Sequence, residues 1–106
     1  MSAYRDFSLD EVKQGLAEHS ILLVDVREPH EFVAGHIPGA VNMPLSSFDP
    51  AEIAARPGQT VVFSCRSGVR TLKAIGASLD AGFPYDAHYP GSMLEWAQAG
   101  EEIEAG

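Results

Sequence analysis

The residues most able to do chemistry lie together in one short segment around the only cysteine of the chain. Cys65 is followed at once by Arg66 and, after three small or apolar residues, by Arg70. Nearby positive charge and converging backbone N–H groups stabilise a thiolate and lower the pKa of a thiol below its free value. Gly68 suits a tightly curled loop, because glycine reaches backbone angles that other residues adopt only with strain. The segment therefore predicts an ionised cysteine nucleophile.

A second interpretation is that Cys65 fills the core as a small apolar side chain, as most free cysteines do. Such a filler does not need two arginines and a glycine beside it, so we favour the reactive interpretation. A single cysteine also excludes an internal disulfide and a thiolate-rich zinc site. We therefore expect a free thiol.

The arginines beside Cys65 suit an anionic substrate. Guanidinium groups bind oxyanions through forked, charge-assisted hydrogen bonds. This favours a small anion such as thiosulfate over a neutral molecule. We expect the substrate-binding loop to consist of Arg66, Ser67, Gly68, Val69 and Arg70.

A strand and a helix must hold this loop in place. Residues 60–64 form the clearest β-branched run in the chain, which is typical of a strand that ends at Cys65. From Arg70 onward, apolar residues recur at helical spacing until Gly82, which is placed to end the helix. A loop between a strand end and a helix N-terminus lets its backbone N–H groups converge near the sulfur.

The rest of the chain alternates strand and helix patterns in the same way. Ser8 and Glu11 have the spacing of a capping box, so a helix is expected to run to about His19. Residues 21–26 form an almost continuous apolar run, typical of a parallel strand buried on both faces. Further strands are expected at residues 40–42 and 87–89, and further helical segments at 29–34, 50–55 and 93–99.

This alternation predicts a single α/β domain with a central, mostly parallel β-sheet and helices on both faces. In such sheets, ligands gather at the carboxyl ends of the strands, where Cys65 is placed. A chain of 106 residues has room for one core. We expect one domain over residues 1–106, with its core at about 5–100 and a solvated acidic tail at 101–106.

Charge and hydropathy argue against several classes of partner. Seven Lys and Arg residues stand against fifteen Asp and Glu residues, a formal net charge of −8. A surface of that sign repels nucleic acids and anionic membranes, so we expect neither as a partner. No run approaches the roughly 20 apolar residues of a membrane span, and residues 1–7 lack the basic and apolar start of an export signal. The sequence thus predicts a cytoplasmic protein.

Three motifs in order along the chain resemble the rhodanese homology domain. They are Asp25-Val26-Arg27-Glu28 with Glu31-Phe32, then Gly35-His36-Ile37-Pro38-Gly39-Ala40, then CRSGVRT from Cys65 to Thr71. The resemblance runs from the first expected helix to about Gly100. It implies a single-domain thiosulfate sulfurtransferase, in which Cys65 carries a sulfane sulfur as a persulfide and residues 66–70 bind the anionic donor.

The length of the cysteine loop distinguishes this sequence from related enzymes. The related cell-cycle phosphatases and arsenate reductases carry a cysteine loop of the form C-x5-R, whereas Cys65 and Arg70 give C-x4-R. Within the family, basic loops resemble those of thiosulfate users rather than mercaptopyruvate users. The chain departs from the family pattern where Pro90-Gly91-Ser92 stands in place of a Gly-Gly pair, although Trp96 matches.

The resemblance implies two half-reactions on one residue. Thiosulfate loads sulfur onto Cys65, and cyanide, a small thiol or a partner protein removes it. Because the chain has no second cysteine, it needs such an external acceptor. Two other functions stay open: a phosphatase or arsenate reductase, and a non-enzymatic rhodanese-like module that docks on a partner.

Four other residues have simpler structural interpretations. Asp25 and Arg27 follow a buried strand and could orient the cysteine loop, yet polar groups at strand ends are usually satisfied by neighbouring backbone. His36 lies in a turn rich in Gly and Pro, and an already ionised thiol needs no base. Trp96 fits core packing. The remaining histidines lack metal-ligand spacing, so we expect no metal and no cofactor.

Overall fold

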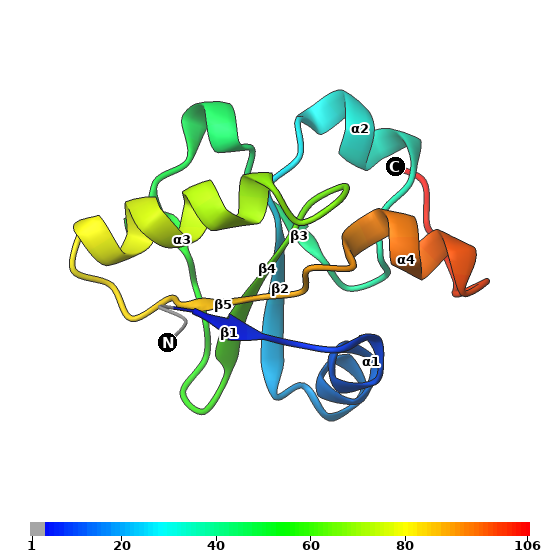
Figure 1. Ribbon diagram of the computed structural model, residues 1–106, viewed down its shortest axis with the longest axis horizontal. Helices are drawn as coiled ribbons and strands as arrows, with labels where there is room; N and C mark the ends of the chain where they lie inside the picture. Colours follow the sequence, from blue (N-terminus) through cyan, green and yellow to red (C-terminus); the bar gives the residue numbers. More distant parts are fainter. Residues whose placement is uncertain (1–3) are drawn as a thin grey trace.

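Five parallel strands form one sheet in the computed structural model, which describes residues 4–106. Hydrogen-bonded neighbours follow the order β1-β5-β4-β2-β3 (Figure 1). The strands are β1 (Arg5–Asp6), β2 (Ile21–Asp25), β3 (Val41–Asn42), β4 (Thr60–Ser64) and β5 (Ala87–His88). The helices are α1 (Leu9–Glu18), α2 (Pro29–Ala34), α3 (Arg70–Asp80) and α4 (Ser92–Gln98), with 3₁₀ turns η1 (Leu45–Ser47) and η2 (Pro50–Glu52). Residues 1–3 of the expected domain lie outside the described residues.

The two central strands are the long apolar runs of the sequence. β2 and β4 pair over their whole length, from Ile21 opposite Thr60 to Asp25 opposite Ser64. Four of the five residues in each strand are buried. Burial on both faces explains why these runs lack the alternation of a half-exposed strand. Because the strands are parallel, their carboxyl ends meet at one edge of the sheet, and Cys65 follows β4 there.

Side chains of the sheet pack in two separate hydrophobic cores, one on each face of the sheet. On one face, Val62 packs in a cluster with Val12 of α1 and Trp96 of α4. On the other face, Phe63 packs in a cluster with Ile75 of α3. Helices therefore cover both faces of the sheet, and the predicted α/β architecture is confirmed.

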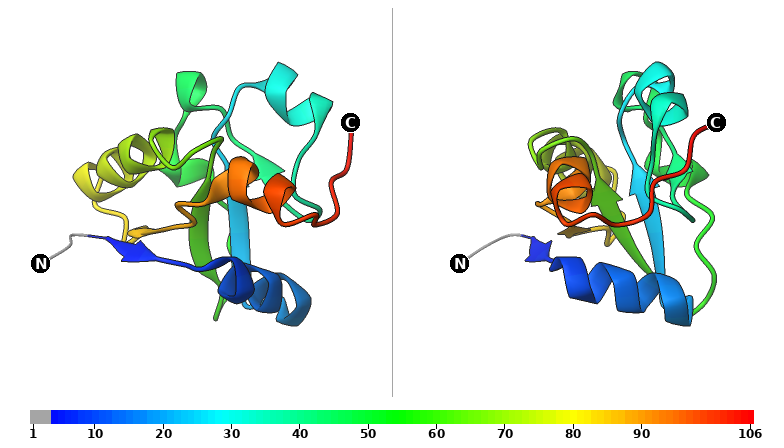
Figure 2. Two further views of the ribbon diagram at one scale, coloured as in Figure 1. Left: turned by 45° about the vertical axis from the view of Figure 1, so that its right-hand side comes forward. Right: turned by 90° about the vertical axis from the view of Figure 1, so that its right-hand side faces the viewer.

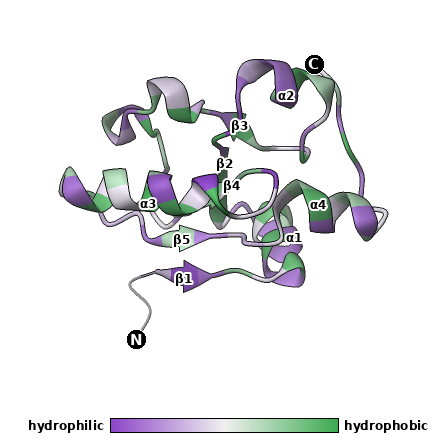
Figure 3. Cartoon of the chain, turned by 45° about the horizontal axis from the view of Figure 1, so that its top comes forward, coloured by the Kyte–Doolittle hydropathy of each residue, from purple (hydrophilic) through white to green (hydrophobic). Residues whose placement is uncertain are grey.

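One of the two edge strands, β1, is missing from the elements that the sequence predicts. Arg5 pairs with Ala87 and Asp6 with His88, which places β1 beside β5. β1 is short and hydrophilic (Figure 3), and both of its residues are exposed. It therefore lacks the apolar alternation that marks a strand in a sequence. Only its pairing with a distant segment defines it.

The helices begin and end close to their predicted limits. At the start of α1, the Ser8 hydroxyl accepts the Glu11 N–H at 3.1 Å, and the Glu11 carboxylate accepts the Ser8 N–H at 2.9 Å, which confirms the capping box. The helix ends at Glu18 and is capped by His19, whose φ is 57°. The segment at 50–55 forms only the 3₁₀ turn η2. Within residues 4–106, no helix is long and apolar enough to cross a membrane.

The segment after α4 is docked by its backbone, although its acidic side chains are mostly exposed. Glu104 and His36 exchange two backbone hydrogen bonds, of 2.8 and 3.0 Å. The Trp96 indole N–H donates to the Glu102 carbonyl at 2.7 Å. Figure 2 shows the segment running from α4 toward α2. The side chains of this segment are therefore mostly in solvent, while its backbone is bonded to the segment after α2.

Candidate active site

Cys65 lies directly after β4 and is only 1% exposed. Residues 65–69 link β4 to α3 and pass close to α2 and α4 (Figure 1). Two contacts show this position: the Leu94 N–H of α4 donates to the Arg66 carbonyl at 3.0 Å, and Arg70 donates to Glu31 of α2 at 2.7 Å. Three helices thus hold the cysteine loop.

Backbone N–H groups surround the Cys65 sulfur. The Gly68 N–H donates to Sγ at 3.0 Å. Burial by itself raises the pKa of the Cys65 thiol, but N–H groups of the loop and of the first turn of α3 outweigh it, so the pKa lies below its ordinary value. These groups belong to Thr71, Gly68, Ser67 and Arg70. The loop therefore stabilises a thiolate, and it does so chiefly through backbone amides.

Gly68 allows the loop to curl as expected. Its φ of 88° lies in the left-handed region, where side chains are strained. A Cβ at this position would lie only 2.6 Å from the Pro90 carbonyl oxygen. Glycine is therefore needed both for the turn and for the close approach of the segment before α4.

The two arginines of the loop have different surroundings. Arg66 is exposed, as are Ser67 and Val69. Arg70 donates two hydrogen bonds to the Glu31 carboxylate, at 2.7 and 3.0 Å. A bound anion would thus meet one arginine at the exposed rim and one that already has an anionic partner. Anion binding by both arginines stays a prediction.

Glu31 of α2 is the ion-pair partner of Arg70. The hydrogen bonds from Arg70 lower its pKa to about 2, against the opposing effect of burial. The same carboxylate accepts the Glu28 N–H at 3.1 Å and so caps α2. A glutamate three positions after the N-cap is the usual partner in such a cap, although Glu28 is not among the residues that the N-cap position prefers. The ion pair with Arg70 has no local signal in the sequence, since the two residues are 39 positions apart.

Asp25 and Arg27 form a buried ion pair. Arg27 Nη2 lies 2.8 Å from Asp25 Oδ2, and the two side chains are 7% and 2% exposed. The same nitrogen donates to the Gly35 carbonyl at 2.8 Å. The pair joins the end of β2 to the turn after α2. These contacts fit the structural interpretation of both residues.

His36 and Trp96 also make structural contacts. The His36 ring stacks on Phe32 with 3.8 Å between centroids, and its Nδ1 lies 2.9 Å from the Phe32 carbonyl. Trp96 is buried in the core between the sheet and α1. Neither contact places the side chain in the cysteine loop.

A chain of polar groups supports the loop from β5. The Thr71 hydroxyl donates to the Gly68 carbonyl at 2.9 Å and lies 2.7 Å from Nδ1 of His88. Nε2 of His88 lies 3.0 Å from the Asp6 carboxylate. The chain joins β1 and β5 to the start of α3. Sequence reasoning missed it, because nothing local marks His88 as the partner of Thr71.

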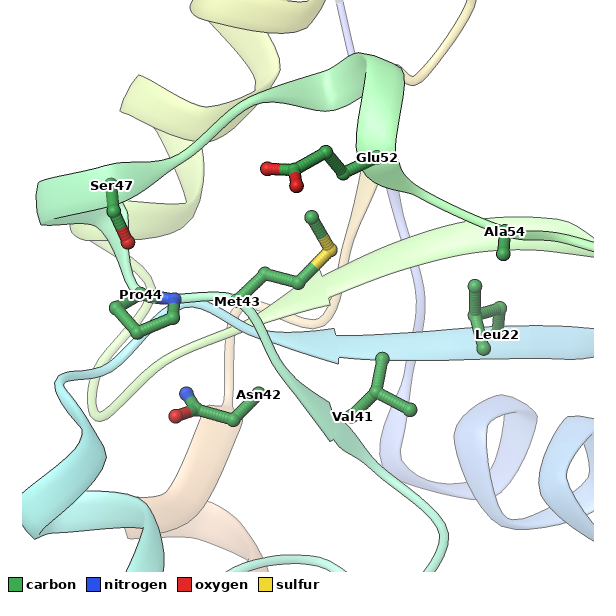
Figure 4. Close-up of a pocket in the computed structure, with 8 residues that line it drawn as sticks. All are labelled: Leu22, Val41, Asn42, Met43, Pro44, Ser47, Glu52 and Ala54. Atoms are coloured by element: carbon green, nitrogen blue, oxygen red, sulfur yellow. The ribbon is translucent and has the colours of Figure 1, made fainter.

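A groove with a volume of about 430 Å³ lies beside β3. Figure 4 shows the side chains of Leu22, Val41 and Met43 along it, with Glu52 across from them. Cys65 is not among the residues that line this groove. The groove is therefore separate from the cysteine loop.

Fold and loop together define an α/β protein that holds an activated cysteine at the carboxyl edge of a parallel sheet. The family model of the rhodanese-like domain matches residues 8–99. The chain belongs to the rhodanese-like domain family of sulfurtransferases, which confirms the family that the sequence motifs indicate.

Relatives and solved structures agree with this assignment. An uncharacterized protein of Synechocystis is 40% identical over 83 residues, which cover 78% of this chain and 46% of that protein. The thiosulfate:glutathione sulfurtransferase of Saccharomyces cerevisiae is 31% identical over an alignment of 115 positions, gaps included, that covers 94% of this chain and 83% of the yeast protein. The structure of the human single-domain sulfurtransferase TSTD1 matches with a TM-score of 0.73 and 31% identity, over 92% of this chain and 97% of the human one. The chain thus spans about half the length of its cyanobacterial relative.

Proposed function

We propose that this protein transfers the outer sulfur of thiosulfate to a thiol or to cyanide through a persulfide on Cys65. The observation that carries the proposal is the set of backbone N–H groups around the Cys65 sulfur, which lower the pKa of the thiol. The name of the yeast relative supports thiosulfate as donor and a thiol of the glutathione type as acceptor.

In the first half-reaction, the Cys65 thiolate attacks the outer sulfur of thiosulfate. A bond forms between Sγ and that sulfur, the sulfur–sulfur bond of thiosulfate breaks, and sulfite leaves with the electron pair. Arg66 at the exposed rim provides positive charge for the incoming and leaving anions. Ser67, Gly68, Val69 and Arg70 complete the proposed anion-binding loop.

In the second half-reaction, the acceptor attacks the outer sulfur of the persulfide and Cys65 leaves as a thiolate. A thiol acceptor departs as its own persulfide, and cyanide departs as thiocyanate. The N–H groups that stabilise the thiolate also make it a good leaving group. Because Cys65 is the only cysteine, the acceptor is external: a small thiol of the cytoplasm or a partner protein.

Loop length argues against phosphate or arsenate chemistry at the same loop. Only four residues separate Cys65 from Arg70, whereas the related phosphatases and arsenate reductases have five residues between cysteine and arginine.

Intact-mass measurement tests the proposal. Reduced wild-type protein incubated with thiosulfate is expected to gain the mass of one sulfur atom, and cyanide is expected to remove it. Cys65→Ser should gain none, whereas the control Ser78→Ala, a buried serine of α3, should gain it. Turnover of an aryl phosphate without a sulfur adduct would instead favour a phosphatase. No adduct and no turnover would favour a docking module.

A further inference from the structure

Ser92, the first residue of α4, has a backbone conformation that serine rarely adopts. Its φ of 52° lies in the left-handed region, where a Cβ is strained. The residue is also completely buried. Glycine would form the same turn without strain. What serine adds at this position is its hydroxyl.

The Ser92 hydroxyl lies among groups of the cysteine loop and of the segment before α4. It accepts the Cys65 N–H at 3.0 Å and donates to the Tyr89 carbonyl at 2.8 Å. It also lies 3.9 Å from the Cys65 sulfur. A hydroxyl carries one proton, so it donates either to the carbonyl or to the sulfur at any moment, while it keeps the Cys65 N–H as its donor.

The next residues of α4 complete this hold on Cys65. The Met93 N–H donates to the Cys65 carbonyl at 3.1 Å, and the Leu94 N–H donates to the Arg66 carbonyl at 3.0 Å. With Ser92, both backbone polar groups of Cys65 are therefore bonded to the start of α4. The peptide planes before and after Cys65 are fixed, and the direction of its side chain follows from them.

We propose that Ser92 is a positioning residue for sulfur transfer: its hydroxyl fixes the Cys65 backbone so that Sγ stays at the Gly68 N–H. The kinetic part of this inference rests on the proposed function, whereas the position of the resting thiol does not. Loss of one hydrogen bond of ordinary strength corresponds to a rate lower by about tenfold.

Two substitutions distinguish the effect of the Ser92 hydroxyl from the effect of the backbone strain. Ser92→Ala removes the hydroxyl and keeps the strained Cβ, whereas Ser92→Gly removes both. Ser92→Gly is therefore expected to unfold at a higher urea concentration than Ser92→Ala. Both variants are nevertheless expected to form the persulfide about tenfold more slowly. The loss should lie in kcat, with KM for thiosulfate within about twofold of wild type.

The matched control is Ser78→Ala. Ser78 is also completely buried, and its hydroxyl donates to the Ala74 carbonyl at 2.8 Å within α3. Its loss removes a buried hydroxyl without touching the cysteine loop. The control is expected to form the persulfide at the wild-type rate.

If Ser92 had a purely structural role, the rate of persulfide formation would follow the stability of each variant. Ser92→Gly, the more stable variant, would then regain the wild-type rate. Wild-type rates in Ser92→Gly would therefore overturn the proposal.

The rate of Cys65 alkylation by iodoacetamide at fixed pH gives a second readout that needs no sulfur donor. If wild type forms no persulfide, the proposed function fails. The alkylation rates then still test whether Ser92 positions the Cys65 thiol. Rates about tenfold slower in both variants support positioning, and rates equal to wild type refute it.

Discussion

Replacing Glu31 by glutamine removes one charge and keeps the size of the side chain. In the native protein this carboxylate receives two hydrogen bonds from Arg70, at 2.7 and 3.0 Å, and one from the Glu28 N–H at 3.1 Å. Glutamine still accepts the Glu28 N–H through its carbonyl oxygen, but it cannot pair with both guanidinium nitrogens. Glu31→Gln therefore isolates the ion pair that joins α2 to the start of α3.

The size of the effect follows from the pKa of Glu31. Without solvent screening, a fall from its ordinary value of 4.5 to about 2 corresponds to about 3 kcal/mol of stability. The Glu31 and Arg70 side chains are 25% and 31% exposed, so solvent screens part of their attraction. We expect Glu31→Gln to lower the free energy of unfolding by about 1–2 kcal/mol at pH 7.

The effect has a defined dependence on pH. The pKa of Glu31 is lower in the folded state than in the unfolded one, so its charge stabilises the fold above pH 4.5. This contribution is lost as the pH falls from 4.5 through about 2, and it is absent below both pKa values, where the carboxylate is protonated in both states. The variant has no such carboxylate. The difference in stability between wild type and Glu31→Gln should therefore shrink over that range.

Urea unfolding at several pH values measures this difference. Trp96, the only tryptophan of the chain, is 5% exposed and reports unfolding through its fluorescence. Asp86→Asn is the matched control, because it breaks an exposed pair with Arg5 and should change stability by less than about 0.5 kcal/mol. A difference for Glu31→Gln that is as small as the control, or that stays constant from pH 7 to pH 3, would refute the reasoning.

Three further variants test other contacts. Arg66→Ala, which removes the exposed charge at the rim, is expected to raise KM for thiosulfate about fivefold in steady-state assays, with kcat retained; an unchanged KM would exclude Arg66 from donor binding. Gly68→Ala, which places a Cβ 2.6 Å from the Pro90 carbonyl oxygen, should lower the free energy of urea unfolding by about 2 kcal/mol; a wild-type midpoint would contradict this. Ser64→Ala removes a buried hydroxyl that lacks a hydrogen-bond partner in the part of the chain that the structure describes. Its free energy of unfolding should rise by up to about 1 kcal/mol, and a fall would contradict the reasoning.

The central part of the fold can be predicted from local patterns. β2 and β4 come from apolar runs, and α1 begins at a capping box whose two residues are only three positions apart in the sequence. The order of strands and the edge strand β1 depend on pairing between distant segments. The docked segment after α4 depends in the same way on His36, which a local pattern of glutamates does not reveal.

The candidate site likewise has a part that local sequence predicts and a part that depends on distant residues. The cysteine loop is predictable because Cys65, Gly68 and the arginines are consecutive or nearly so. The partners of the loop are not, since Glu31 and Ser92 reach it from other elements. Sequence reasoning therefore identifies the nucleophile and the loop, whereas the contacts that orient them require the tertiary structure.

The pairing of β1 with β5 also affects the order in which the sheet can be completed. Asp6 and His88, which face each other across these strands, are 82 positions apart. The entropy lost in closing a loop grows with its length, and during synthesis β1 emerges from the ribosome long before β5 has been made. A growing chain can pair β2 with β4 before β5, the partner of β1, has been made. The first strand of the sheet therefore cannot join it before β5 has been synthesised, and the sheet is complete only after that point.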